Sequence, residues 1–138
     1  MVSVIVNKKG FGKTKQLIDM AEKAVSITNG NVVFIEKGSK LTYDLTHKAR
    51  LIDVDQYNIS GYNSFFGFLS GICAGNYDVT DIFIDSTFKI CGDDKRELSE
   101  FLNNINAISL NSGTNFIFSL SCDKSELPAD IDNNIKIY

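Results

Sequence analysis

The chain has 138 residues, a length typical of one domain, and we expect a single domain that spans residues 1–138. Hydrophobic residues make up 43% of the sequence and charged residues 22%, values that argue against intrinsic disorder. A net charge of −3, from 14 basic and 17 acidic residues, gives no strong nucleic-acid signal. No apolar run approaches the ~20 residues of a membrane-spanning helix, so we expect no membrane span.

Cysteine usage bears on the compartment. Cys73, Cys91 and Cys122 show no Cys-x-x-Cys spacing, and His47 is the single histidine, so a structural zinc site is not expected. We expect reduced thiols in a cytoplasmic protein. Lys8 and the lysine after it follow the first apolar run directly, which argues against a signal peptide.

The order of apolar runs predicts an alternation of strands and helices. Strands are expected at short Val- and Ile-rich runs, at residues 2–6, 32–35, 51–54, 82–84, 116–120 and 135–138. A weaker alternation at Leu41, Tyr43 and Leu45 suggests a short edge strand. Helices are expected at 13–28, at 60–75, and from a cap at Asp93 or Asp94 to a stop at 111–113. We therefore expect an α/β fold, a three-layer α/β/α sandwich with a mostly parallel sheet of about five or six strands.

The loop after the first strand carries the most specific motif. Residues 7–14 read Asn-Lys-Lys-Gly-Phe-Gly-Lys-Thr, and their last three positions match the phosphate-loop pattern G-x-x-x-x-G-K-[ST]. The glycines let backbone N–H groups turn toward a phosphate, the lysine reaches β- and γ-phosphate oxygens, and the threonine offers its hydroxyl to Mg²⁺. The predicted nucleotide-binding residues are Lys9, Gly10, Phe11, Gly12, Lys13, Thr14 and Lys15.

Asn7 stands at the first position of the motif, where the pattern has glycine. Asparagine is among the residues that best tolerate positive φ, so we expect the loop to close with some strain at Asn7. The alternative is a glycine-rich turn that binds nothing. The Val/Ile strand before the motif and the amphipathic helix after it favour the phosphate loop.

Two polar residues at strand ends complete the predicted site. Asp85 follows an apolar strand, and ligands gather at the carboxyl ends of strands in open α/β sheets, so we expect it to hold Mg²⁺ together with Thr14. The alternative is that Asp85 caps a turn or the next helix. Ser121, with Ser119 as second choice, is expected to face the γ-phosphate, the alternative being a buried serine satisfied by backbone groups. The predicted catalytic residues are Lys13, Asp85 and Ser121.

The residue that would polarise an attacking water is not evident from the sequence. Many phosphate-loop ATPases place a glutamate directly after the acidic strand end, whereas this chain has Ser86 there, a poor base at neutral pH. The candidate substitutes are Glu36, Asp53 and Asp55, which follow other expected strands, although each is also a plausible solvated carboxylate.

These motifs, in this order, resemble the phosphate-loop (P-loop) NTPase superfamily, in particular its RecA-like branch. The stretches 36–44 and 75–78 also resemble small stand-alone bacterial proteins, mostly from Gram-positive species, that are usually labelled ATP-binding. The resemblance covers nearly the whole chain. It implies an α/β/α sandwich with Lys13, Thr14 and Asp85 at a nucleotide site.

We therefore expect binding of ATP, or another nucleoside triphosphate, with Mg²⁺ and slow or partner-activated hydrolysis. Arg50 and Arg96 are the only arginines, so a protein partner is a possible source of an arginine finger. One alternative is a non-hydrolysing scaffold that has kept the fold. A small-molecule kinase is a weaker alternative, because 12 of the 14 basic residues are lysine and no arginine pair is present to clamp phosphates. No Asn-Lys-x-Asp stretch follows a strand, which favours adenine over guanine.

Overall fold

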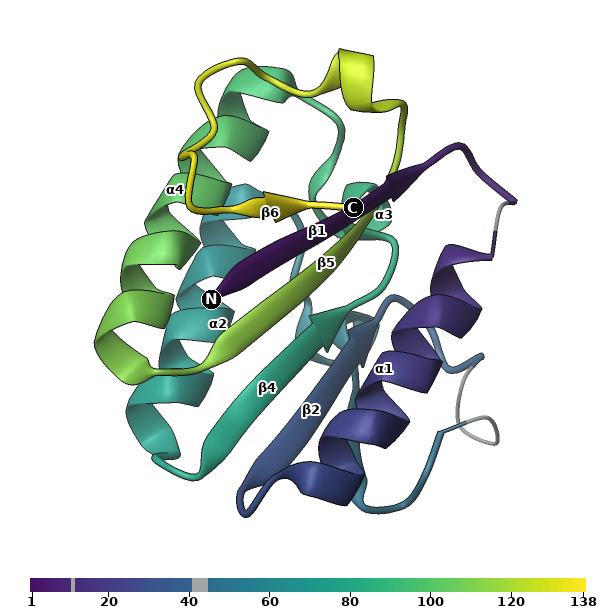
Figure 1. Cartoon of the computed structure of the whole chain (residues 1–138), viewed down its shortest axis with the longest axis vertical. Coiled ribbons are helices and arrows are strands. Elements are labelled where there is room, and N and C mark those ends of the chain that lie inside the picture. Colours follow the sequence, from purple (N-terminus) through teal and green to yellow (C-terminus); the bar gives the residue numbers. More distant parts are fainter. Residues whose placement is uncertain (11, 41–44) are drawn as a thin grey trace.

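A parallel sheet forms the middle layer of the molecule. The computed structural model describes residues 1–10, 12–40 and 45–138, which form three layers around six strands (Figure 1). Neighbouring strands all run parallel, in the order β3-β2-β4-β5-β1-β6. The strands are β1 (Val2–Asn7), β2 (Asn31–Glu36), β3 (Ala49–Asp53), β4 (Val79–Ile84), β5 (Asn115–Ser121) and β6 (Lys136–Ile137). The expected α/β sandwich is confirmed.

The central strands are buried on both faces, as expected for a parallel sheet. Phe83 of β4 packs in one apolar cluster with Leu17, whereas its neighbours Ile82 and Ile84 pack in a second cluster with Phe65. Successive side chains of a strand point to opposite faces, so the two clusters are the two cores on either side of the sheet. Because all strands run the same way, their carboxyl ends meet at one edge.

The helices cover both faces of the sheet. The helix α1 (Lys13–Ile27) lies on one face, and α2 (Tyr62–Gly75) and α4 (Lys95–Ser112) lie on the other (Figure 1). A shorter helix, α3 (Thr87–Cys91), follows β4 directly. The helix caps agree with the sequence at α4, where the Asp94 side chain accepts the Glu97 N–H at 2.9 Å.

The elements that the sequence pattern did not predict are all short. The sequence pattern missed α3 because five residues are too few to show helical periodicity. It also missed two 3-10 helices, Val54–Tyr57 and Lys124–Glu126. The expected alternation at Leu41 and Tyr43 lies outside the described residues.

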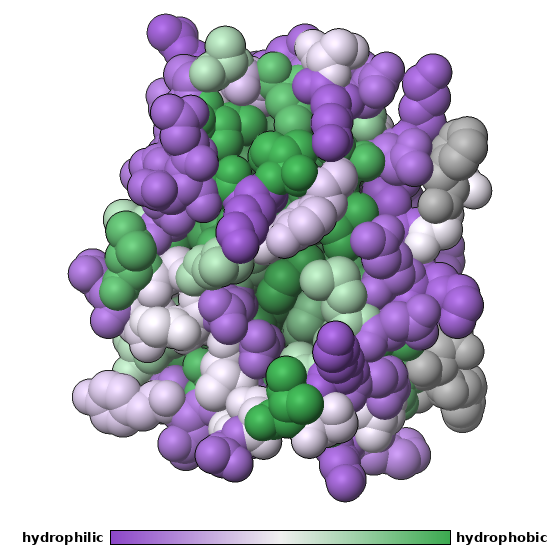
Figure 2. Space-filling model, in the orientation of Figure 1, coloured by the Kyte–Doolittle hydropathy of each residue, from purple (hydrophilic) through white to green (hydrophobic). Residues whose placement is uncertain are grey.

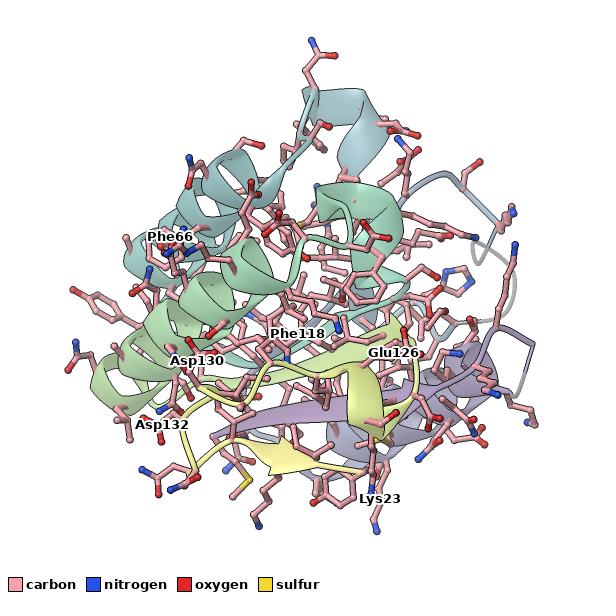
Figure 3. The ribbon with its side chains drawn as sticks, turned by 90° about the horizontal axis from the view of Figure 1, so that it is seen from above. Lys23, Phe66, Phe118, Glu126, Asp130 and Asp132 are labelled. Carbon is pink, nitrogen blue, oxygen red and sulfur yellow. The ribbon has the colours of Figure 1, made fainter. Side chains whose placement is uncertain are left out.

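The C-terminal segment is tied to α4 and to the sheet. Asp130 accepts a hydrogen bond from the Ser99 hydroxyl at 2.7 Å, and the Asp132 N–H donates to Asn103 at 2.8 Å. Figure 3 shows Asp130 and Asp132 beside α4, with Phe118 in the interior. The surface in Figure 2 is largely hydrophilic, with hydrophobic residues gathered near β6 and the segment before it. Among the described residues, none of the helices has the length and apolar character that crossing a membrane would require.

Candidate functional site

The loop after β1 leaves the carboxyl edge of the sheet and leads into α1. Gly10 has φ 90°, and Gly12, the residue before α1, has φ 77°. A Cβ at either position would meet no atom within 4 Å, so backbone conformation and not space requires glycine there. The first N–H groups of α1 have no acceptor within the helix, and they make this end of α1 attractive to an anion.

Asn7 differs from the expectation of strain at the first position of the motif. It is the last residue of β1, and its backbone pairs with Ser121 of β5. Its side-chain Oδ1 accepts the Lys8 N–H at 2.9 Å. Outside glycine, positive φ occurs in residues 1–10, 12–40 and 45–138 only at Asn58 and Ser86. The expected positive φ at Asn7 is therefore wrong: the strand continues through this residue and the turn follows it.

The Lys13 side chain lies across the loop. Its Nζ donates to the Lys8 carbonyl oxygen at 2.9 Å, and the residue is only 8% exposed. Burial lowers the pKa of the Lys13 ammonium from its ordinary value, and the nearby Asp85 carboxylate opposes this shift. A buried cation with one carbonyl partner is well placed to exchange that partner for a phosphate oxygen.

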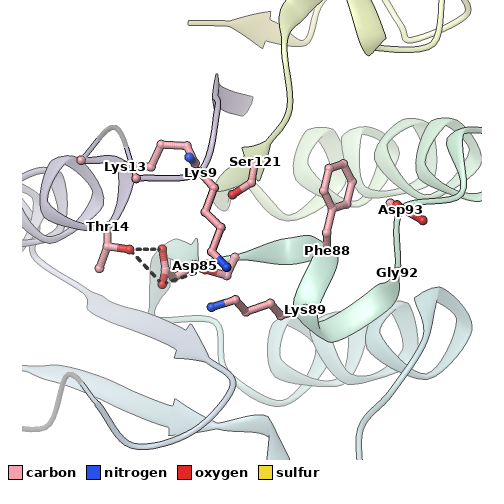
Figure 4. A pocket seen from close by; sticks show the side chains of 12 residues that line it. Lys9, Lys13, Thr14, Asp85, Phe88, Lys89, Gly92, Asp93 and Ser121 are labelled. Carbon is pink, nitrogen blue, oxygen red and sulfur yellow. Dashed lines mark hydrogen bonds between the residues drawn. The ribbon is translucent and has the colours of Figure 1, made fainter.

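Asp85 joins the loop to the ends of β4 and β5. The Thr14 hydroxyl lies 3.0 and 3.2 Å from the two Asp85 carboxylate oxygens (Figure 4). The Ser119 hydroxyl donates to Oδ1 of Asp85 at 3.3 Å. The Ser86 hydroxyl donates to Oδ2 at 3.2 Å. Asp85 is 9% exposed, and the residue before α3 is Ser86, so the carboxylate does not cap that helix. The two residues predicted to hold Mg²⁺ thus lie in direct contact.

The donor set fits Mg²⁺ in one particular way. Among the described residues no group of three or more His, Cys, Asp or Glu side chains could hold a metal ion. Magnesium commonly binds through one or two protein oxygens, with phosphate oxygens and water completing its shell. Thr14 and Asp85 suit that pattern and would hold the ion only together with a bound phosphate.

A pocket of about 630 Å³ opens over these residues (Figure 4). One side, which we call the loop wall, is formed by Lys9, Gly10, Gly12, Lys13 and Thr14. The opposite side, the α3 wall, is formed by Phe88, Lys89, Gly92 and Asp93. Asp85, Ser86 and Ser121 complete the described lining.

Most of the predicted site residues therefore line one pocket. Two do not enter this description: Phe11 lies outside the described residues, and Lys15 is exposed and pairs with Asp19 at 3.6 Å. The two candidate serines lie in different places: Ser121 lines the pocket, whereas Ser119 contacts Asp85. Ser119 is 1% exposed and also accepts the backbone N–H of Ser86 at 2.8 Å.

The three candidate bases lie along the same sheet edge but are not among the described residues that line the pocket. Asp53 accepts the N–H groups of Gly38 and Asp55, and Asp55 pairs with Lys37 at 2.6 Å. These contacts join the segments that follow β2 and β3. Glu36 is 4% exposed at the end of β2, one residue beyond the Ile35 that pairs with β4.

The α3 wall is the part of the site that the sequence motifs did not indicate. The sequence indicates only its position: the chain after Asp85 leaves the sheet at the same edge as the loop after β1. Comparison with known proteins gives no assignment, because no family model and no curated protein matches the chain.

Proposed function

We propose that the chain binds a nucleoside triphosphate, most simply ATP, with Mg²⁺ in the pocket over Asp85. The observation that carries the proposal is the contact of the Thr14 hydroxyl with the Asp85 carboxylate, at 3.0 and 3.2 Å, directly beside a loop with positive φ at both glycines. Such a contact joins the two residue types that share Mg²⁺ in phosphate-loop proteins.

Each residue would have a defined part in binding. The N–H groups around Gly10 and Gly12, with the positive end of α1, would receive phosphate oxygens. Lys13 would exchange the Lys8 carbonyl for an oxygen of the β- or γ-phosphate. Thr14 and Asp85 would hold Mg²⁺, which when bound neutralises charge on the phosphates.

Slow hydrolysis, or hydrolysis activated by a partner, agrees best with the surroundings of Asp85. Ser86 follows it in place of a base, and the described lining of the pocket contains lysines but no arginine. Glu36, buried at the neighbouring strand end, is our candidate for positioning the water. Binding without hydrolysis, as in a scaffold protein, remains the alternative. Three free cysteines support the expected cytoplasmic location.

Isothermal titration calorimetry with MgATP tests the proposal. We expect saturable binding by the unaltered protein and its loss in Lys13→Ala, because the variant lacks the buried cation of the loop. Lys136→Ala is the matched control, since it removes an exposed lysine from β6. Equal affinity of the Lys13→Ala variant and the unaltered protein would refute the site, and absence of binding by the folded, unaltered protein would refute the function. Titration with MgGTP then tests whether the site prefers adenine or guanine, and we expect GTP to bind more weakly than ATP.

A further inference from the structure

Lys89 enters the nucleotide pocket from the α3 wall, opposite the phosphate loop. Figure 4 shows the side chains of Lys9 and Lys89 coming from opposite walls and both directed into the pocket near Asp85. The loop motif supplies Lys9 and Lys13, so Lys89 is the one basic residue among the described lining residues that lies outside this motif.

The position of α3 is fixed at both ends. Before the helix, Ser86 adopts φ 54° and its N–H donates to Ser119 of β5 at 2.8 Å. At its end, the Tyr62 hydroxyl of α2 donates to the Gly92 carbonyl oxygen at 2.6 Å, and the Gly61 N–H donates to Ile90 at 3.0 Å. The backbone that carries Lys89 is thus bonded to both β5 and α2.

The inner face of α3 determines where Lys89 points. Thr87 and Ile90, three residues apart, are both buried, so they form the face that packs on the core. Lys89 lies on a different face and is exposed. In the part of the chain that the structure describes, its ammonium group has no hydrogen-bond or ion-pair partner.

The residues that line this pocket carry a net positive charge, although the chain as a whole is negatively charged. The lining carries three lysines, at 9, 13 and 89, and two carboxylates, Asp85 and Asp93, which gives the pocket one excess positive charge, whereas the chain carries −3. A triphosphate that brought Mg²⁺ to Asp85 would add further negative charge to the pocket. An unpaired ammonium on the far wall is then the complement of the terminal phosphate.

We propose that Lys89 binds the terminal phosphate of the nucleotide and makes the site distinguish a triphosphate from a diphosphate. The inference rests on the proposed function. In the proposed site Asp85 and Thr14 would hold the metal, which would neutralise charge on the terminal phosphates. The α3 wall faces the loop wall across that place, so a group projecting from it meets the end of the phosphate chain. The α- and β-phosphates stay with the loop.

Paired affinities test this role. Calorimetry with Mg²⁺ would measure the dissociation constants of ADP and of the non-hydrolysable β,γ-imido analogue of ATP, for the unaltered protein and for variants at Lys89. We expect Lys89→Ala to lower the affinity for the analogue by about tenfold or more, which corresponds to the loss of one charge-assisted hydrogen bond. The affinity for ADP should change by less than about twofold. Lys89→Arg keeps the charge and is expected to restore the preference for the triphosphate.

Lys95→Ala provides the matched control, because this exposed lysine at the start of α4 lies near α3 but does not line the pocket. It is expected to change neither affinity by more than about twofold. An equal loss for both nucleotides, or no loss for the analogue, would overturn the role of Lys89 while leaving the nucleotide site intact. If the unaltered protein binds neither nucleotide, the proposed function fails and this inference fails with it.

Discussion

The loop wall and the α3 wall face each other across one pocket but are built in different ways. The loop wall takes much of its shape from residues close in the sequence: Gly10 and Gly12 provide the positive φ angles, and Lys13 donates to Lys8. Thr14 adds a contact with the distant Asp85. The α3 wall has helical hydrogen bonds of its own, such as that from the Gly92 N–H to the Phe88 carbonyl oxygen at 2.8 Å, but its position depends on distant residues. It is held by Ser119 of β5 at one end and by Tyr62 of α2 at the other.

This difference explains why one wall has a sequence motif and the other does not. A loop whose shape depends largely on residues close in the sequence needs particular residue types at fixed spacing, and that requirement is visible in the sequence. A short helix held by distant residues requires only that partners be present elsewhere in the chain. Variants that weaken each wall, or the residues that join them, should therefore have separable effects on binding and on stability.

The largest effect on nucleotide binding is expected from Asp85→Asn, because Asp85 contacts both Thr14 of the loop wall and Ser119 of β5. The amide keeps the size of the side chain but lacks the charge that would hold Mg²⁺ in the proposed site. We expect the affinity for MgATP to fall by about 100-fold, comparable to the upper range for altered metal-site residues. Without Mg²⁺, affinity for ATP should be equal or higher, because a negative charge beside the phosphates is gone. Calorimetry with and without Mg²⁺ measures both.

Asp93→Asn is the control for that variant, since it neutralises an exposed carboxylate of the α3 wall in the same pocket. It should change the Mg²⁺ dependence by less than about threefold. If Mg²⁺ raises the ATP affinity of Asp85→Asn as much as that of the unaltered protein, Asp85 does not hold the metal. The same conclusion follows if Asp93→Asn loses more of this Mg²⁺ dependence than Asp85→Asn does.

An intermediate effect is expected from Ser119→Ala, which removes the partner of α3 on the sheet. The Ser86 N–H would lose its acceptor and Asp85 would lose one donor. A buried polar group left without a partner costs about 1–3 kcal/mol, and we expect the free energy of unfolding to fall by that amount. Urea denaturation followed by circular dichroism measures it.

Ser26→Ala in α1 controls for the loss of a hydroxyl, because Ser26 is exposed and its hydroxyl donates to the Lys23 carbonyl oxygen of the same helix at 2.7 Å. Its effect should stay within about 0.5 kcal/mol. A similar small effect of Ser119→Ala would mean that the α3 wall does not depend on β5.

Ser119 also shows where prediction from the sequence ends. The strands and the three long helices were predictable, because apolar periodicity and β-branched runs are local, and the strand-end rule brought Asp85 to the loop. Which serine meets Asp85 depends on the register of two strands. Ile84 pairs with Phe118, so the next residues, Asp85 and Ser119, become neighbours. Nothing in either strand alone specifies that alignment. The sequence predicted Ser121, with Ser119 as second choice, to face the γ-phosphate, and it did not indicate a partner for Asp85.

The smallest effect is expected at the other end of the α3 wall, in Tyr62→Phe. The variant loses the 2.6 Å hydrogen bond to Gly92, worth about 1 kcal/mol, and leaves the Gly61 N–H bonded to Ile90. Cys91 reports the change, because burial and, to a lesser extent, the Glu97 carboxylate raise the pKa of its thiol from 9.0 to about 12. Only the thiolate is alkylated, so in the unaltered protein the reaction of Cys91 should accelerate about tenfold per pH unit up to pH 12.

Iodoacetamide labelling followed by mass spectrometry separates a firm α3 wall from a loose one. At pH 8 a thiol with a pKa of 9.0 is about one-tenth ionised, whereas one with a pKa of about 12 is ionised about once in 10⁴ molecules. Cys91 should therefore react about 1000-fold more slowly than a free thiol, and several-fold faster in Tyr62→Phe than in the unaltered protein, because α3 opens more often. Rapid labelling of the unaltered protein would show that α3 is not packed as described. In that case Lys89 would have no fixed place opposite the loop. The two walls would then differ in how firmly they are packed, as well as in whether a sequence motif predicts them.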